Sequence, residues 1–361
     1  MKVLFVGNPS ERPTDGGSAS FQQAVLAGLK RMRSAHECSY VQPTPGKPGV
    51  VQAWVIEKQI DFVWFLSPFY EPVEVPFATT VWDLAHRESP CFPEVSLSGW
   101  TFDQREGHYS HVLPRASIVV IGNSVGARSV HEFYRVPLEN ICEIPLPVDT
   151  AALQGLQANS SVLEPYGLRP GEYLFYPAQF WPHKNQITLV DTLTLLHKAG
   201  KRFKLVFTGS DKGNRAHVES YVAQAGLKES VVFAGFVPTE VLHQLYLNAF
   251  ALTFASLLGP DNIPPLEAMA LGCPVVCATF SGAREQLGEA ALFFAGLDAR
   301  EAASQVLKLT DSQLRAQLLG KGQALVQTYT ADEYIRKINA ALDRFALKRR
   351  LWGAGNSYRH L

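Results

Sequence analysis

The sequence predicts an α/β protein built from two doubly wound, Rossmann-like units in tandem. Short apolar runs alternate with helical patterns along the chain, which is typical of parallel sheets covered by helices on both faces. A polar stretch without periodicity interrupts this alternation near the middle of the chain. A length of 361 residues is enough for two domains of ordinary size, each with its own core.

The first half of the chain is expected to form one sheet. Its strand candidates are the apolar runs at 2–7, 62–67, 79–82, 117–122 and 141–145. Helices are expected over 18–32 and 124–134. Ser124 is the predicted N-cap of the second helix, because a serine hydroxyl accepts a hydrogen bond from a free N–H group of the first turn.

The second half repeats the pattern and predicts a second sheet. Strands are expected at 173–177, 203–209, 231–235, 251–255 and 274–278, and helices at 185–199, 216–225, 239–248, 299–309 and 331–347. We therefore expect a first domain at 1–150, a linker at 151–171, a second domain at 172–330 and a C-terminal helix within 331–361.

Composition excludes several classes of protein. The chain has 47% hydrophobic and 18% charged residues, and its 33 basic and 33 acidic residues cancel, so no net charge points to nucleic acid. Five cysteines at irregular spacings, without C-x-x-C, argue against a disulfide framework or a zinc ribbon. The first residues read as a buried strand rather than a signal peptide, and no run approaches twenty apolar residues, so a cytoplasmic location is expected.

The most informative segment runs from 259 to 276. Pro264 and Pro265 predict a helix start, since proline tolerates the missing donors of a first turn. Glu267 would then lie in that first turn, where the helix dipole favours a negative charge. Such a helix end can bind phosphate or sugar oxygens through its N–H groups, and its carboxylate can bind a ribose diol. Acidic, proline-capped helix starts also occur without a ligand, so both interpretations stay open.

This segment resembles the signature of retaining GT-B glycosyltransferases of family 4, roughly E-G-F-G-L-P-x-L-E-A-M-A-x-G-x-P-V. Glu267 matches the second glutamate of the pair, whereas Gly259 stands where the first belongs. The resemblance implies two Rossmann-like domains facing a central cleft, with the last helix crossing back to the first domain. Either the Asp261 carboxylate or the backbone N–H groups of Asp261, Asn262 and Ile263 would then contact the donor sugar in place of the missing glutamate.

The resemblance also assigns roles at the ends of the second-domain strands. Lys184 matches a lysine that clamps the donor diphosphate, and its place after a strand suits ligand binding in an α/β sheet. Gln179 stands where the family has an arginine, and His183 is an alternative cation. Further donor contacts are implied at Thr208, Gly209, Phe236 and Val237, and Glu285 is expected to brace the loop behind Glu267. Glycines that merely end strands are the alternative interpretation.

In the first domain, Gly16 and Gly17 follow the first strand, and the resemblance places them over the diphosphate. Asp83 and His86 lie in a loop that contacts sugars in the family, and they are the expected acceptor-side residues. His86, Lys184 and Asp261 form the expected catalytic set. A structural histidine is the common alternative for a lone His after a strand.

No metal or other cofactor is expected. His108 and His111 have a spacing that can ligate a metal, but the sequence offers no third ligand, which favours surface positions for both. The chain also contains no Asp-x-Asp.

By resemblance, the protein would transfer a sugar from a GDP-, UDP- or dTDP-linked donor to a hydroxyl acceptor with retention. The favoured substrates are a mannose- or rhamnose-type donor and a lipid-linked oligosaccharide acceptor. The expected product is a cell-surface polysaccharide. Basic and apolar residues between Arg344 and Trp352 suggest peripheral contact with the inner face of the membrane, or simply a solvated helix end. A sugar-nucleotide epimerase and a non-catalytic sugar-nucleotide or glycan binder remain alternatives.

Overall fold

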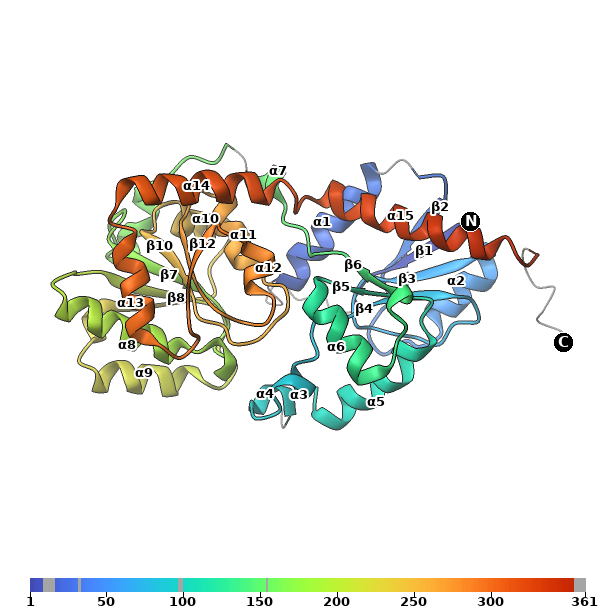
Figure 1. The fold of residues 1–361 in the computed structure, drawn as a ribbon, viewed down its shortest axis with the longest axis horizontal. Helices are drawn as coiled ribbons and strands as arrows, with labels where there is room; N and C mark the ends of the chain where they lie inside the picture. Colours follow the sequence, from blue (N-terminus) through green and yellow to red (C-terminus); the bar gives the residue numbers. More distant parts are fainter. Residues whose placement is uncertain (9–16, 32–33, 97–99, 154, 354–361) are drawn as a thin grey trace. The chain divides into compact units, whose positions relative to one another are not determined.

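A computed structural model describes residues 1–8, 17–31, 34–96, 100–153 and 155–353 (Figure 1). The chain divides into two compact units. The first contains Met1–Glu88, Phe102–Pro147 and Tyr329–Leu361, and the second contains Ser89–Thr101 and Val148–Thr328.

The first unit is a parallel six-stranded sheet in the order β2-β1-β3-β4-β5-β6. Its strands are β1 (Lys2–Val6), β2 (Glu37–Val41), β3 (Phe62–Phe65), β4 (Phe77–Thr80), β5 (Ile118–Ile121) and β6 (Ile141–Glu143). The α-helices of this unit are α1 (Gly17–Arg31), α2 (Val50–Lys58), α3 (Ala85–Glu88), α5 (Phe102–Val112), α6 (Ser124–Tyr134) and α15 (Ala331–Arg349).

The last helix belongs to the core of the first unit. Tyr334 of α15 meets Phe21 of α1 edge to face, with the ring centroids 5.7 Å apart. Gly28 permits the close approach of the two helices, because a Cβ atom there would lie 2.8 Å from Cγ1 of Ile335. Further along α15, Phe345 packs on Phe62 of β3 at 4.6 Å between centroids. The C-terminal segment therefore completes a core that the first 147 residues begin.

The second unit is also a parallel six-stranded sheet, in the order β12-β11-β10-β7-β8-β9. Its strands are β7 (Tyr173–Pro177), β8 (Lys204–Thr208), β9 (Val231–Gly235), β10 (Ala251–Phe254), β11 (Val275–Ala278) and β12 (Ala291–Phe294). Its α-helices are α4 (Pro93–Ser96), α7 (Thr150–Leu153), α8 (Gln186–Lys198), α9 (Arg215–Gln224), α10 (Thr239–Leu247), α11 (Ile263–Ala270), α12 (Ala283–Leu287), α13 (Ala299–Lys308) and α14 (Ser312–Val326).

The predicted fold class is confirmed, with local corrections. Asn123 rather than Ser124 caps α6, because the Asn123 side chain accepts a hydrogen bond from the Gly126 amide at 2.9 Å. The strand expected at 79–82 lies two residues earlier, as β4. Strands β2 and β12 and helix α14 were not expected at all. Strand β2 begins with the exposed residues Glu37 and Cys38, so its sequence does not read as an apolar run.

The expected linker at 151–171 is structured. It contains most of α7 and a 3-10 segment, Ser160–Tyr166, and the side chains of Leu153 and Leu163 are buried. Burial of these two leucines explains why the segment groups with the second unit rather than lying between the units. No helix among the described residues is long and apolar enough to cross a membrane.

Candidate functional site

The loops that follow β7 and β10 meet at the carboxyl edge of the second sheet. Lys184 ends a 3-10 turn, Pro182–Lys184, after β7, and its Nζ donates to the Ser256 hydroxyl at 3.2 Å. The Leu257 amide donates to the His183 carbonyl at 2.9 Å, and the Tyr176 hydroxyl donates to the Lys184 carbonyl at 2.8 Å. These bonds hold the Lys184 ammonium at the edge where parallel α/β sheets bind their ligands.

Asn185 fixes the turn from Lys184 into α8. Its backbone is left-handed, with φ 55°, a conformation that asparagine tolerates better than most residues. The buried side chain donates from Nδ2 to the Gly296 carbonyl at 2.7 Å. Helix α8 therefore begins at Gln186, one residue after the predicted start, and Asn185 ties the Lys184 loop to the end of β12.

Gln179 occupies the position in the loop after β7 where the family has an arginine. Its Oε1 accepts a hydrogen bond from the Trp181 indole N–H at 2.9 Å. His183, the expected alternative cation, is held by Glu94 of α4. The backbone amide of His183 and its Nδ1 both lie within hydrogen-bonding distance of Glu94 Oε1, at 2.9 and 2.5 Å. Because a carboxylate accepts, Nδ1 carries the proton in this pair.

Glu94 is a site residue that the sequence did not reveal. Burial on its own raises the pKa of the Glu94 carboxyl, but hydrogen bonds from the His183 side chain and backbone bring that pKa below its ordinary value. Glu94 therefore stays ionised and accepts hydrogen bonds from the backbone and ring of His183. The two residues are 89 positions apart, so no local pattern predicts their contact.

Glu267 lies in the second turn of α11 and not in the first turn as predicted. The helix begins at Ile263, so its first turn contains no acidic residue. The Tyr246 hydroxyl of α10 donates to Glu267 Oε2 at 3.0 Å, and Tyr246 itself is fully buried. Burial raises the pKa of Glu267 above its ordinary value, against the opposing effect of the Tyr246 hydrogen bond. The carboxylate is thus oriented by a neighbouring helix rather than stabilised at the helix end.

The backbone conformation at position 259 explains why glycine replaces the first glutamate of the family pattern. Gly259 has φ +107°, a conformation that L side chains rarely adopt. A Cβ atom at this position would lie 3.0 Å from Asn262 Nδ2, which donates to the Gly259 carbonyl at 3.1 Å. A glutamate at position 259 would strain this turn, so the loop before α11 has a different construction from the family pattern.

Gln286 of α12 fastens the same loop. Its Oε1 accepts from the Asn262 amide at 3.1 Å, and its Nε2 donates to the Asn262 carbonyl at 2.8 Å and to Asp261 Oδ1. These three bonds come from Gln286, and the bracing role expected of the preceding residue, Glu285, stays a prediction. Asn262 is the N-cap residue of α11, yet its side chain makes no capping bond. Its amide is engaged by Gln286 instead of facing outward as expected.

Close packing explains Gly209 without reference to a ligand. Its φ is +129°, and a Cβ atom there would lie 2.5 Å from the Ala178 carbonyl oxygen. The Gly209 amide donates to Gly235 at 2.7 Å, while the Thr208 carbonyl accepts from Ala178 at 3.0 Å. The ends of β7, β8 and β9 are thereby joined.

Phe236 and Val237 differ in accessibility just beyond β9. The Phe236 side chain is 55% exposed at this edge of the sheet, whereas Val237 is buried. Of the two expected base-side residues, Phe236 is therefore the one that presents a side chain to solvent.

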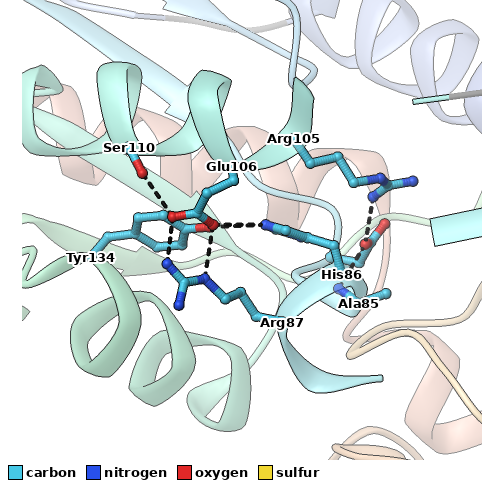
Figure 2. A network of polar contacts seen from close by, with 8 residues as sticks. Ala85, His86, Arg87, Arg105, Glu106, Ser110 and Tyr134 are labelled. Atoms are coloured by element: carbon cyan, nitrogen blue, oxygen red, sulfur yellow. Dashed lines mark hydrogen bonds and ion pairs between the residues drawn. The ribbon is translucent and has the colours of Figure 1, made fainter. Parts of the chain in front are cut away.

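In the first unit, His86 is fully buried rather than exposed to a substrate (Figure 2). Its Nε2 lies 3.0 Å from the Tyr134 hydroxyl and 3.3 Å from Glu106 Oε2. Its ring stacks on Tyr109, with 5.7 Å between centroids, and burial lowers its pKa. Among the alternatives weighed from sequence, this placement supports the structural histidine. Of the two glycines expected over the diphosphate, Gly16 lies outside the described residues and Gly17 is the first residue of α1.

Glu106 is the centre of the network around His86. Arg87 pairs with both of its carboxylate oxygens, and Ser110 and Tyr134 donate to it at 2.9 and 3.0 Å (Figure 2). These hydrogen bonds, the Arg87 pair first among them, lower the pKa of Glu106 to about 2. The network joins α3, α5 and α6.

Asp83, the other expected acceptor-side residue, organises the start of α3. Its Oδ1 accepts from the Ala85 amide at 3.0 Å and from Arg105 Nη1 at 3.1 Å. The side chain of Asp83 is 34% exposed, so this carboxylate, unlike the His86 ring, meets solvent.

Glu106→Gln is expected to lower the free energy of unfolding at pH 7 by about 1–2 kcal/mol, after discounting for solvent screening of a partly exposed pair. Because the folded-state pKa is depressed, this stabilisation is complete above pH 4.5 and is lost as pH falls toward 2. Urea unfolding at pH 7 and pH 3 should therefore show a smaller difference from wild type at pH 3. Glu132→Gln, an exposed change on α6, is the control. An equal difference at both pH values would contradict the assignment.

His111 is exposed as expected, whereas the His108 side chain is half-buried, and burial lowers its pKa. His108 and His111 lie on α5, and among the described residues no group of three His, Cys, Asp or Glu side chains can hold a metal. Arg349 pairs with Asp61 at 2.8 Å within the first unit. Leu347 and Leu351 are 66% and 84% exposed.

A known family model matches the part of the chain that contains this site. Residues 167–324, which contain Lys184, Asp261, Glu267 and Gln286, match the family model described as "Glycosyl transferases group 1". The part of the chain that contains the candidate site is therefore similar to group 1 glycosyltransferases.

The chain is similar along most of its length to a curated relative. It is 25% identical over 372 residues to O-antigen chain mannosyltransferase B of Escherichia coli, covering 91% of this chain and 96% of the relative. It is 28% identical over 113 residues to O-antigen chain mannosyltransferase RfbU of Salmonella typhimurium, covering 31% of each chain. The crystal structure of Anabaena HepE in complex with UDP-glucose has a TM-score of 0.74 at 17% identity, covering 95% of this chain and 100% of that one. Such likenesses show that the two Rossmann-like units have the GT-B fold.

Proposed function

We propose that this protein is a glycosyltransferase that moves a sugar from a nucleoside-diphosphate sugar to a hydroxyl of a growing cell-surface glycan, with retention of configuration and without a metal. One observation carries the proposal. The Lys184 ammonium is held at the carboxyl edge of the second sheet, within the region that matches the family model. A fixed cation at this edge suits a leaving group that gains negative charge as the glycosidic bond breaks.

Each residue of the site has a role in the proposed reaction. Lys184 neutralises the diphosphate as the bond between the anomeric carbon and the phosphate oxygen breaks. Glu267 accepts hydrogen bonds from the ribose hydroxyls, and Asp261 contacts the transferred sugar. The acceptor oxygen forms the new bond on the same face, and its proton passes to the departing phosphate. This front-face path requires no enzymatic nucleophile.

The names of two relatives support a mannose-type donor. Both are called O-antigen chain mannosyltransferases, and one of them aligns with 91% of this chain. A lipid-linked acceptor would bring the protein from the cytoplasm to the inner face of the membrane. The exposed Leu347 and Leu351, beside Lys348 and Arg350, provide a basic and apolar surface for that contact.

Incubation with GDP-, UDP- and dTDP-linked sugars tests the proposal. We expect nucleotide release with one donor only when a glycan acceptor is present, an unchanged anomeric configuration by NMR, and full turnover in EDTA. An isomerised sugar nucleotide from donor alone would indicate an epimerase instead. Binding without release would indicate a non-catalytic protein. Activity that is lost in EDTA and restored by Mg²⁺ or Mn²⁺ would contradict metal independence.

A further inference from the structure

Gln286 is a buried polar side chain for which neither composition nor motif gives a role. It is 2% exposed and lies on the short helix α12, behind the loop that precedes α11. Its amide makes three hydrogen bonds to two consecutive residues of that loop: two with the backbone of Asn262 and one with the carboxylate of Asp261. The segment it holds therefore includes the carboxylate that we assign to the donor sugar.

The chemistry of these three bonds requires an amide. The Asn262 N–H needs an acceptor, whereas the Asn262 carbonyl and the Asp261 carboxylate both need a donor. Glutamine supplies an acceptor oxygen and a donor nitrogen from one planar group. Glutamate has the same size but only acceptors when ionised, so it would face two other acceptors across this contact.

The loop has a particular need for such an anchor. Gly259 places a left-handed turn three residues before the helix N-cap, at the position where the family pattern has a glutamate. The family carboxylate is therefore absent, and Asp261, two residues further on, is the acidic side chain of the turn. The Asp261 carboxylate accepts a hydrogen bond from Gln286, which lies on α12. The position of the candidate sugar contact therefore depends on α12 as well as on α11.

We propose that Gln286 is a positioning residue for the donor sugar. It sets the Asp261 carboxylate and the start of α11 in the geometry that sugar transfer requires, while nucleotide binding depends on Lys184 and Glu267. The inference rests on the proposed function, because it presumes that the loop faces the transferred sugar.

Gln286→Glu tests the proposal. With GDP and GDP-mannose as probes, we expect affinity for GDP to stay within about twofold of wild type, while affinity for GDP-mannose falls toward that of GDP. In the transfer reaction kcat is expected to fall by about a hundredfold, the loss that a small misplacement of a reacting group produces. Amide hydrogen exchange in residues 259–263 is expected to speed up. Gln313→Glu, the same change at an exposed position on α14, is expected to alter none of these.

A second variant separates positioning from a general loss of structure. In Gln286→Glu/Asp261→Asn the donor and acceptor at this contact are exchanged, so part of the exchange protection in residues 259–263 should return, although kcat stays low without the Asp261 carboxylate. Wild-type kcat together with wild-type exchange in Gln286→Glu would overturn the proposal. An equal loss of GDP and GDP-mannose affinity, without rescue by Asp261→Asn, would overturn it as well by assigning Gln286 to the fold alone.

Failure of the proposed function can be told apart from failure of this inference. If the wild-type chain transfers no sugar from any donor, the function fails. Hydrogen exchange and the comparison of GDP with GDP-mannose still report on Gln286, because neither depends on turnover. Unchanged exchange in Gln286→Glu would overturn the inference in that case also.

Discussion

Replacing Glu267 with alanine is expected to weaken the binding of nucleoside diphosphates by on the order of 10²–10⁴-fold. A hydrogen bond to a charged group contributes about 1.5–3 kcal/mol, and we propose that Glu267 accepts one from each ribose hydroxyl. The carboxylate is held for this task by the Tyr246 hydroxyl, 3.0 Å from its Oε2. Isothermal titration with GDP, UDP and dTDP, using whichever nucleotide the wild-type protein binds, measures the loss directly.

Two variants serve as controls for this result. Tyr246→Phe removes the hydroxyl that orients Glu267 but keeps the carboxylate, so its effect on affinity should be much smaller than that of Glu267→Ala. Glu229→Ala removes an exposed carboxylate from the same unit and should have no effect. If folded Glu267→Ala bound nucleotide with wild-type affinity, the ribose assignment would be wrong and Glu267 would be no more than a partner of Tyr246.

The start of α11 shows how precisely the sequence predicts the first residue of a helix. Two prolines predicted a helix start at the correct place to within two residues, but the helix begins at Ile263, with Pro264 and Pro265 inside its first turn. Proline is tolerated throughout that turn, because none of its N–H groups has an intrahelical acceptor. The prolines therefore locate the turn without fixing its first residue, and this uncertainty was enough to assign Glu267 to the first turn although it lies in the second.

Alternation of apolar runs and helical patterns predicted the two sheets because each buried parallel strand reads as apolar by itself. The partners in the site have no such local pattern. Gln286 reaches Asn262 across 24 positions, Ser256 meets Lys184 across 72, and Glu94 meets His183 across 89. Tertiary packing alone brings these pairs together. The burial of His86 likewise depends on Tyr109 and Tyr134, which come from other helices.

Lys184→Ala is expected to reduce kcat by about 10²–10³-fold, the usual effect of removing one group that stabilises charge in a transition state. The loop after β7 carries Gln179 where the family has a cation, so the ammonium of Lys184 has no neighbouring arginine at that position to share the diphosphate charge. Steady-state kinetics at saturating donor measure the change. Lys198→Ala, which removes an exposed lysine from the far end of α8, should leave kcat unaltered.

Lys184→Arg distinguishes charge from geometry. Arginine keeps the positive charge, but its planar, longer side chain does not reproduce the contact of Nζ with the Ser256 hydroxyl at 3.2 Å. We expect kcat of the arginine variant to lie between those of wild type and Lys184→Ala, because the charge remains near the diphosphate in a less favourable position. Turnover of Lys184→Ala at the wild-type rate would show that other groups compensate the leaving-group charge. His183, kept in register by Glu94, would then be the next cation to replace, because its ring is held in the same 3-10 turn.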